Sequence, residues 1–323
     1  MAATAHVANT QRPSWLTRFW AVVKYELLWN IRKKKFIGLV IAAFALVTVQ
    51  LALPAAFGVD QNPYFAVTFS AGNLLFFLFA IVTSMNSISG EFESGTIVPL
   101  LTKPVSRTMV FLGKLLAAFI VLMVTYTVLF TYSTVGGIIV YGPQENLHLV
   151  PLALLGNVIS TSIWIAIVLA AGAISKNSLI AALSAFSLFI AFGFATAIVS
   201  AFSNQPEILN YIPGSGVTGT LNVPPRGANI TIQNITLTSN SISTGTDSIG
   251  ANLVNYALYP SATVNITRME VFSARPGQPP QIRHLYTEPI SLVVARSISV
   301  AFLYTFVFLF IAWYAFKRTQ ILE

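Results

Sequence analysis

Side chains with reactive groups are concentrated in one stretch of this 323-residue chain, residues 89–107, which reads SGEFESGTIVPLLTKPVSR. It carries the carboxylates of Glu91 and Glu93, the glycines Gly90 and Gly95, two prolines and two cations. The stretch separates two hydrophobic runs of membrane-spanning length, and its composition is typical of an element at a membrane surface. There its apolar side chains can enter the interface while the carboxylates face water or a partner. An ordinary charged loop between two helices is the alternative.

Other groups that could support catalysis are scattered. The three histidines, His6, His148 and His284, have no metal-ligand spacing, and the chain has no cysteine for a disulfide or a thiolate site. Gly113 and Lys114 are followed by a leucine and lack the upstream glycine of a phosphate-binding loop. The sequence therefore predicts no catalytic residue, no metal site and no nucleotide bound by this chain.

The composition indicates which elements must position the charged stretch. Hydrophobic residues make up 55% of the chain and charged residues 9%, whereas soluble domains average roughly 25% charged residues. Six runs reach the length of about 20 apolar residues that a membrane span needs, namely residues 36–58, 65–88, 109–135, 150–174, 179–202 and 290–316. Because the runs are long and do not alternate, they favour an all-α polytopic membrane protein over a barrel.

Charge placement predicts the orientation of these six spans. Cations gather on one side of them, at Arg12, Arg18, Lys24, residues 32–35, Lys103, Arg107, Lys176, Lys317 and Arg318. The opposite loops, residues 59–64 and 141–149, contain Asp60 and Glu145 but no lysine or arginine. By the positive-inside rule, the basic side and both termini are cytoplasmic in a cell membrane. The net charge of +8 therefore indicates contact with lipid headgroups rather than nucleic-acid binding.

An amphipathic helix is predicted before the first span, over residues 14–32. Apolar side chains recur at helical spacing on one face, at Leu16, Phe19, Trp20, Val23, Leu27 and Ile31. Arg18, Tyr25 and Arg32 fall on the opposite face. The pattern favours a helix lying in the membrane interface, with an ordinary buried helix of a soluble tail as the alternative. The residues of this interfacial helix that are expected to matter for its function are Trp15, Phe19, Trp20, Lys24 and Glu26.

A polar segment between the fifth and sixth spans is rich in proline, glycine, serine, threonine and asparagine. Short alternating runs at residues 229–232, 235–238 and 264–271 predict a small external domain of β-strands. Asn229, Asn234 and Asn265 each begin an Asn-Ile-Thr glycosylation triplet, although such triplets also arise by chance in this composition.

The chain is thus expected to comprise a tail with the interfacial helix (1–35), five spans with the charged hairpin (36–202), the β-rich extracellular domain (203–289) and the last span (290–323). Arg296 lies near the outer end of the sixth span. It is expected to reach the outer interface or the external domain. A substrate-binding or gating role is the sharper alternative.

The charged stretch and its surroundings resemble the membrane subunit of ATP-binding-cassette exporters of the second type. That family combines a cytoplasmic amphipathic helix with a Glu-x-Glu-x-Gly-Thr pattern, two leucines, Pro-Val-x-Arg and a Gly-Lys pair opening the third span. The matching residues are Glu91, Glu93, Gly95, Thr96, Leu100, Leu101, Pro104, Val105, Arg107, Gly113 and Lys114. The resemblance covers about the first 130 residues; the later spans agree in number and orientation only.

The resemblance implies that two permeases, identical or related, form a path above two ATPase subunits that bind ATP and Mg²⁺. The hairpin would dock on the ATPase through Glu91, Phe92, Glu93, Gly95, Thr96, Pro104 and Arg107. Glu91 or Glu93 would then meet a basic residue of the ATPase. Gly90 and Gly95 would permit tight turns, and Lys114 would reach the headgroup region from its span.

Two other classes of function stay open at this point. A membrane anchor or assembly factor could present the external domain to a surface partner and use the hairpin only for docking. A channel or secondary carrier is disfavoured, because few charges lie within the spans and broken spans at matched positions are not evident. The apolar spans suit a lipid, an amphipathic peptide or a hydrophobic drug as substrate.

Overall fold

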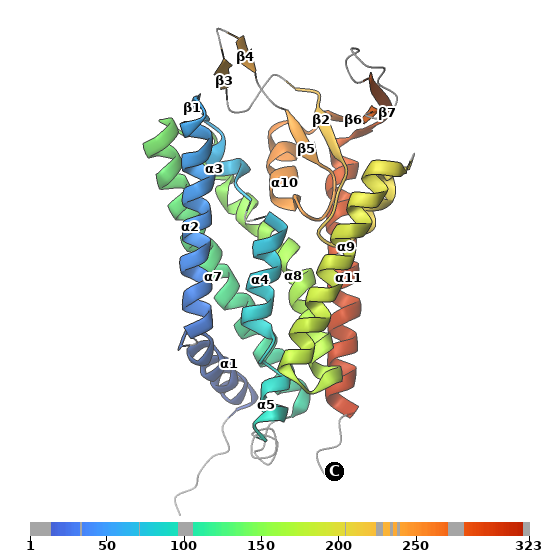
Figure 1. The fold of residues 1–323 in the computed structure, drawn as a ribbon. Coiled ribbons are helices and arrows are strands. Elements are labelled where there is room, and N and C mark those ends of the chain that lie inside the picture. Colours follow the sequence, from blue (N-terminus) through green and yellow to red (C-terminus); the bar gives the residue numbers. More distant parts are fainter. Residues whose placement is uncertain are drawn as a thin grey trace, which may run out of the picture.

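The computed structural model describes residues 14–32, 34–70, 72–95, 106–203, 205–223, 229–232, 235–237, 240–270 and 281–318. Within these residues, six helical segments are long and apolar enough to cross a membrane. They contain α2 (Lys34–Ala56), α4 (Gly72–Ser84), α7 (Arg107–Tyr141), α8 (Val150–Ser175), α9 (Ser178–Phe202) and α11 (Ile290–Arg318). Their number and order agree with the six predicted runs, and the helices run side by side as a bundle (Figure 1).

The second predicted span is broken, which corrects the expectation of one continuous helix over residues 65–88. A short helix, α3 (Phe65–Thr68), ends before Phe69, and α4 begins at Gly72. The Ser70 hydroxyl accepts the Gly72 N–H at 3.2 Å, and Gly72 has a φ of +77°. That dihedral is far from helical values and is tolerated because glycine has no Cβ. The hydrophobicity of residues 65–88 does not indicate where the helix breaks, so the break could not be predicted from it.

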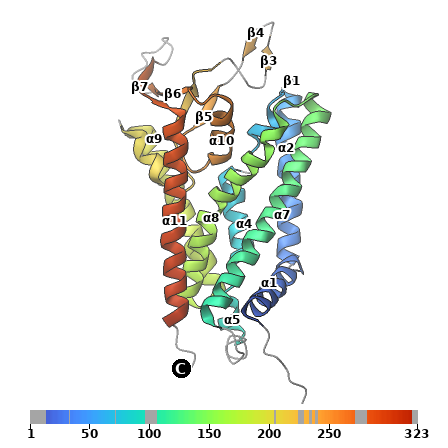
Figure 2. The ribbon, with the colours of Figure 1, turned by 180° about the vertical axis from the view of Figure 1, so that it is seen from behind.

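The two ends of the bundle differ in structure. At one end lie α1 (Trp15–Arg32), which crosses obliquely below α2, the short helix α5 (Ser89–Glu93) and the last turn of α11 (Figures 1 and 2). We call this the hairpin end. All described strands and helix α10 (Ile249–Leu258) lie at the opposite end, which we call the sheet end (Figure 1).

Helix α8 occupies the centre of the bundle, between α4 and α7 on one side and α11 on the other (Figure 2). Seven consecutive residues, from Ile163 to Leu169, are buried, as expected for a helix that is apolar all round. Trp164 packs edge-on against Phe77 of α4 and Phe189 of α9, whose rings stack at 4.5 Å. The inside of the single chain is therefore filled with side chains at this level.

The sheet end contains two antiparallel sheets. The larger has the strand order β5-β2-β6-β7, from β2 (Thr218–Leu221), β5 (Ser241–Ser243), β6 (Thr263–Glu270) and β7 (Gln281–Pro289). The smaller joins β1 (Val59–Gln61), β3 (Asn229–Ile232) and β4 (Ile235–Leu237). The three predicted strands correspond to β3, β4 and β6, whereas the other strands and α10 were not anticipated. Strand β7 leads directly into α11 at Ile290.

The sheet end packs against the helical bundle through close backbone contacts. Helix α10 meets α8 where Gly156 faces Gly250, and a Cβ on Gly156 would overlap the Gly250 main chain. The Ser160 hydroxyl of α8 donates to the Thr246 carbonyl at 2.7 Å, just before α10. Gly214, with a φ of +70°, lies against the Asn73 side chain at the start of α4. The sheet-end domain is thus in contact with α4 and α8, in addition to α11, which follows it in the chain.

Candidate functional site

A buried cluster of three charged side chains joins α1, α5 and α7 at the hairpin end. The Lys114 ammonium lies 2.5 Å from Glu26 Oε1 and 2.7 Å from Glu91 Oε1. The exposed fraction of the side chain is 2% for Lys114, 3% for Glu26 and 16% for Glu91. We call these three residues the ion cluster. Because buried charges are stable only when paired, the cluster requires all three elements to be in place together.

The sequence around Lys114 explains how α1 comes close enough to reach it. The preceding residue, Gly113, lies against α1, where an added Cβ would be 2.8 Å from Val22 Cγ1. A larger residue would force the two helices apart, since real side-chain carbons do not approach so closely. On α1, Val23, Glu26 and Asn30 form the buried face. The glycine therefore permits the contact, and the lysine supplies the charge that holds it.

Three further contacts attach the segments on either side of residues 96–105 to the bundle. Glu93 of α5 accepts the Ser178 N–H at 2.9 Å and the Ser178 hydroxyl at 2.5 Å, at the first residue of α9. The Phe92 ring lies 6.2 Å from that of Phe316 in α11. Arg107, the first residue of α7, donates to the Lys317 carbonyl at 2.9 Å. The hairpin is thereby connected to α1, α7, α9 and α11.

The structure revises several expectations for the hairpin. Glu91 and Glu93 were expected to face water or a partner, but each is bonded within the chain, because Lys114 and the first residue of α9 lie within reach. Lys114 is buried between carboxylates rather than extended to the headgroups. Gly95 has the positive φ, +67°, that a turn requires, whereas Gly90 lies inside α5. Thr96 and Pro104 lie outside the described residues.

The amphipathic pattern of α1 is divided between two environments. Of the predicted apolar face, Val23 is buried, but Leu16, Trp20 and Ile31 keep 66%, 55% and 55% of their surface exposed. Trp15, also exposed, stacks on Phe19 at 5.3 Å. Lys24 is exposed and Glu26 is buried. Glu26 was predicted as a residue of the interfacial helix, but its pairing with Lys114 was not. The position of Glu26 one turn after Val23, on the same face of α1, was the available signal.

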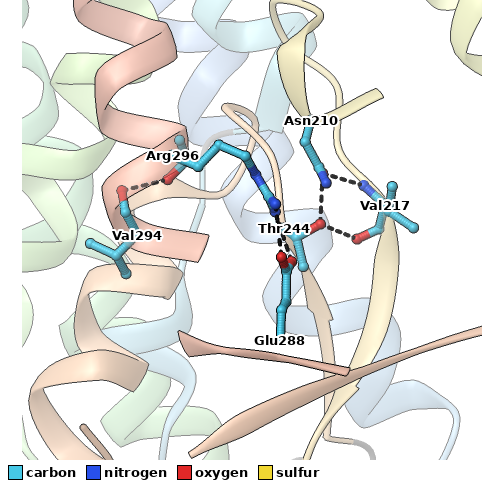
Figure 3. Close-up of polar contacts among 7 residues, drawn as sticks. Asn210, Val217, Thr244, Glu288, Val294 and Arg296 are labelled. Carbon is cyan, nitrogen blue, oxygen red and sulfur yellow. Dashed lines mark hydrogen bonds and ion pairs between the residues drawn. The ribbon is translucent and has the colours of Figure 1, made fainter. Parts of the chain in front are cut away.

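Arg296 of α11 reaches the sheet-end domain (Figure 3). Its guanidinium donates two hydrogen bonds of 2.7 Å to the Glu288 carboxylate in β7, and Glu288 is only 5% exposed. The two-bond geometry is the strong form of an arginine–carboxylate pair. In the same region, the Asn210 side-chain oxygen accepts the Thr244 hydroxyl at 2.7 Å and the Val217 N–H at 3.3 Å (Figure 3).

We expect the Arg296→Met variant to destabilise the sheet-end domain by about 3 kcal/mol, the lower end of the cost of removing one partner of a buried ion pair. Limited proteolysis of the purified chain should then cleave faster between residues 203 and 289. The double variant Arg296→Met with Glu288→Gln should recover most of the resistance, because no charge stays buried. Unchanged proteolysis with impaired transport would instead favour the gating role of Arg296.

The other residues considered in the sequence lie apart from the ion cluster. Asn265 Oδ1 in β6 accepts the Thr287 hydroxyl at 2.8 Å, Asn229 begins β3, and Asn234 lies outside the described residues. His284 pairs with Thr287 at 2.9 Å. Within the part of the chain that the structure describes, no group of three or more His, Cys, Asp or Glu residues is arranged to hold a metal ion.

The bundle and its sheet-end domain define a multi-pass helical membrane protein whose charged site sits at one end of the spans. A comparison with protein-family models identifies the family: the model of the ABC-2 family transporter protein matches residues 20–321. The chain therefore belongs to the ABC-2 family of transporter proteins. The match extends the resemblance from the first 130 residues to almost the whole chain. No curated protein matches the sequence.

Proposed function

We propose that this chain is the permease subunit of an ATP-driven exporter, and that it transmits the movement of a separate ATPase to the membrane helices. The ATPase subunits would bind ATP and Mg²⁺, and this chain would hydrolyse nothing by itself. The observation that carries the proposal is the attachment of the hairpin. Glu91 is paired with Glu26 of α1 through Lys114 of α7, and Glu93 is bonded to α9. A force on the hairpin thus acts on several helices at once.

The orientation that we propose puts the hairpin end in the cytoplasm and the sheet end outside the cell membrane. The cations Lys34, Lys35, Lys176, Lys317 and Arg318 lie at the ends of helices on the hairpin side, in keeping with the positive-inside rule. Both termini would be cytoplasmic, and Asn229, Asn234 and Asn265 would be open to glycosylation in a host that has the machinery.

Helix α1 would lie in the cytoplasmic interface of the membrane. Its buried face carries Glu26 and Asn30, while Leu16, Trp20 and Ile31 are more than half exposed. Exposed aromatic and aliphatic side chains beside cations are typical of helices that contact lipid headgroups and the upper acyl chains. Lipid would therefore cover the apolar side of α1 while the ion cluster anchors the opposite side.

The transport path would lie between two permeases, either two copies of this chain or this chain and a relative. The centre of the single bundle is filled, since α8 is buried from Ile163 to Leu169. Helix α9, by contrast, exposes apolar side chains along its length, including Leu179, Leu183, Phe186, Phe194 and Ile198. A substrate that is itself apolar or amphipathic would suit a path bordered by such helices.

Gentle affinity purification from the native membrane tests the proposal. We expect an ATPase of the cassette type to copurify in equal ratio, and its ATP hydrolysis to depend on the permease. Copurification of surface proteins alone would favour the membrane anchor. Flux through the reconstituted chain without ATP would favour a channel or carrier.

We expect the Glu91→Lys variant to uncouple ATP hydrolysis from transport. The change places a second cation beside Lys114 and leaves Glu26 as the one carboxylate of the ion cluster. The new lysine and Lys114 then repel each other, whereas Glu91 and Lys114 attracted each other and held α5 to α7. The measurement is ATP hydrolysed per substrate exported in vesicles that contain the whole complex. Glu145→Lys, at the other end of the bundle, is the matched control. An unchanged ratio in the Glu91 variant would sink this assignment.

A further inference from the structure

A groove of about 750 Å³ lies between α7 and α8, on the side of the bundle that Figure 2 shows. One wall is formed by the first two turns of α8 and the short 3-10 helix before it, η1 (Leu147–Leu149). The other wall is a single face of α7 that carries Met123, Thr127, Phe130, Thr131, Thr134 and Val135. Met123, Val135 and Leu155 are 40%, 50% and 43% exposed, so the described chain leaves the groove open.

The groove lies at the depth of the membrane spans, in the half of the bundle nearer the sheet end. Tyr132, within the lining stretch of α7, is hydrogen-bonded through its hydroxyl to that of Thr48 in α2 at 2.7 Å. Thr48 is closer to the sheet end of α2 than to its start at Lys34. The wall from Met123 to Val135 is about 18 Å long at about 1.5 Å per residue. That length is close to one leaflet, which is half of the hydrocarbon thickness of about 30 Å.

The chemistry of the lining suits an uncharged, apolar occupant. Among the described residues, no ionisable side chain lines the groove. The hydroxyls of Thr127 and Thr131 each donate to a carbonyl one turn earlier in α7, at 2.8 Å. The Thr134 hydroxyl oxygen is buried and has no hydrogen-bond partner among the described residues, so this side chain can contact an occupant only through carbon. Hydrocarbon therefore fits the groove better than a polar ligand, which would lose its hydrogen bonds there.

A lipid reaches this groove directly, whereas a helix of a second permease fits it poorly. The groove is continuous with the exposed apolar surface of α7, where Val124 and Val128 are 59% and 47% exposed and a bilayer would cover them. Helices that associate in membranes do so through small residues, which let the backbones approach closely. The described lining contains methionine, phenylalanine, leucine and β-branched residues, but no glycine, alanine or serine. An extended acyl chain needs no such close approach.

We propose that the groove binds one acyl chain of a phospholipid from the leaflet at the sheet end, and that this lipid is a resident part of the folded protein. The acyl chain lies along α7 and fills the space between α7 and α8. It thereby fixes the separation of two helices with different attachments, since α7 carries Lys114 of the ion cluster and α8 carries Gly156, which contacts α10. The site needs only a bilayer around the bundle and does not depend on an ATPase.

Native mass spectrometry of the full chain, purified and extensively washed in detergent, tests the inference. Thr131→Trp fills the groove with an indole ring, and Val128→Trp places the same ring one turn earlier on α7, exposed and outside the lining. We expect the parent chain and Val128→Trp to retain one phospholipid per chain. Thr131→Trp should lower this occupancy at least about tenfold, because the site then has no room for the acyl chain. Equal retention in the two variants, or a parent chain without phospholipid, overturns the inference.

A second measurement does not require the groove to be filled. Leu155, which lines the groove, is replaced by the photoreactive amino acid p-benzoylphenylalanine, and Val124, exposed on α7 outside the lining, is the matched control position. Irradiation of the washed chain should add the mass of a phospholipid at the Leu155 position, and phospholipase should shorten that adduct. The Val124 position should carry no phospholipid. An adduct at Leu155 with detergent alone, or with a peptide of a second copy of this chain, overturns the inference.

Discussion

The Lys114→Met variant should lose about 3–5 kcal/mol of stability, because two carboxylates then share a buried site with no cation between them. Lys114 and Glu26 are 2% and 3% exposed, so water cannot replace the missing ammonium. We expect α1 and α5 to separate from α7 and transport activity to be lost. The midpoint of thermal unfolding in detergent, followed by size-exclusion chromatography, measures the change.

A charge-neutral version of the cluster distinguishes lost charge balance from lost side-chain volume. Adding Glu26→Gln and Glu91→Gln to Lys114→Met removes the uncompensated charges and should restore most of the stability. Lys176→Met removes an exposed cation from the same end and should change the midpoint little. If the single variant is as stable as the parent chain, the ion cluster does not hold α1 to the bundle.

The Gly156→Val variant should detach α10 from α8 at a cost of about 3 kcal/mol or more, since the contact has no room for a side chain. A Cβ at this position would overlap the Cα and N atoms of Gly250, which are main-chain atoms and cannot rotate away. We expect faster proteolysis of the sheet-end domain while the helical spans stay folded. The rate of cleavage between residues 203 and 289 is the measurement.

Gly193→Val is the matched control for this variant. Gly193 also lies inside a membrane helix, α9, but an added Cβ there meets no atom within 4 Å. The same substitution should therefore leave the domain attached. Equal cleavage in the two variants would mean that valine disturbs the helices in general. The glycine contact between α8 and α10 would then not be what holds the sheet-end domain to the bundle.

The parts of the fold that sequence predicted are those that depend on local composition. Four of the five unbroken spans begin and end within two residues of their predicted runs, α9 covering Ser178–Phe202 where 179–202 was expected, whereas α7 continues to Tyr141, six residues beyond its predicted end. A span is recognised by the length of its apolar run, which needs no knowledge of its neighbours. The hairpin motif was likewise read from consecutive residues, and the family that it indicated is confirmed by the family match.

The sequence by itself determined the number of spans, the charge asymmetry of their ends and the family. Only the tertiary structure decided what the charged residues do. Lys114 pairs with carboxylates 88 and 23 residues away in the chain. The first pair depends on the packing of α1 against α7, and the second depends on the position of α5 beside α7. The break before Gly72 and the contact of Gly156 with Gly250 likewise depend on packing between distant segments. The sequence of an apolar run does not indicate which of its faces packs against another segment, because every face is apolar. These contacts therefore could not be predicted from the sequence.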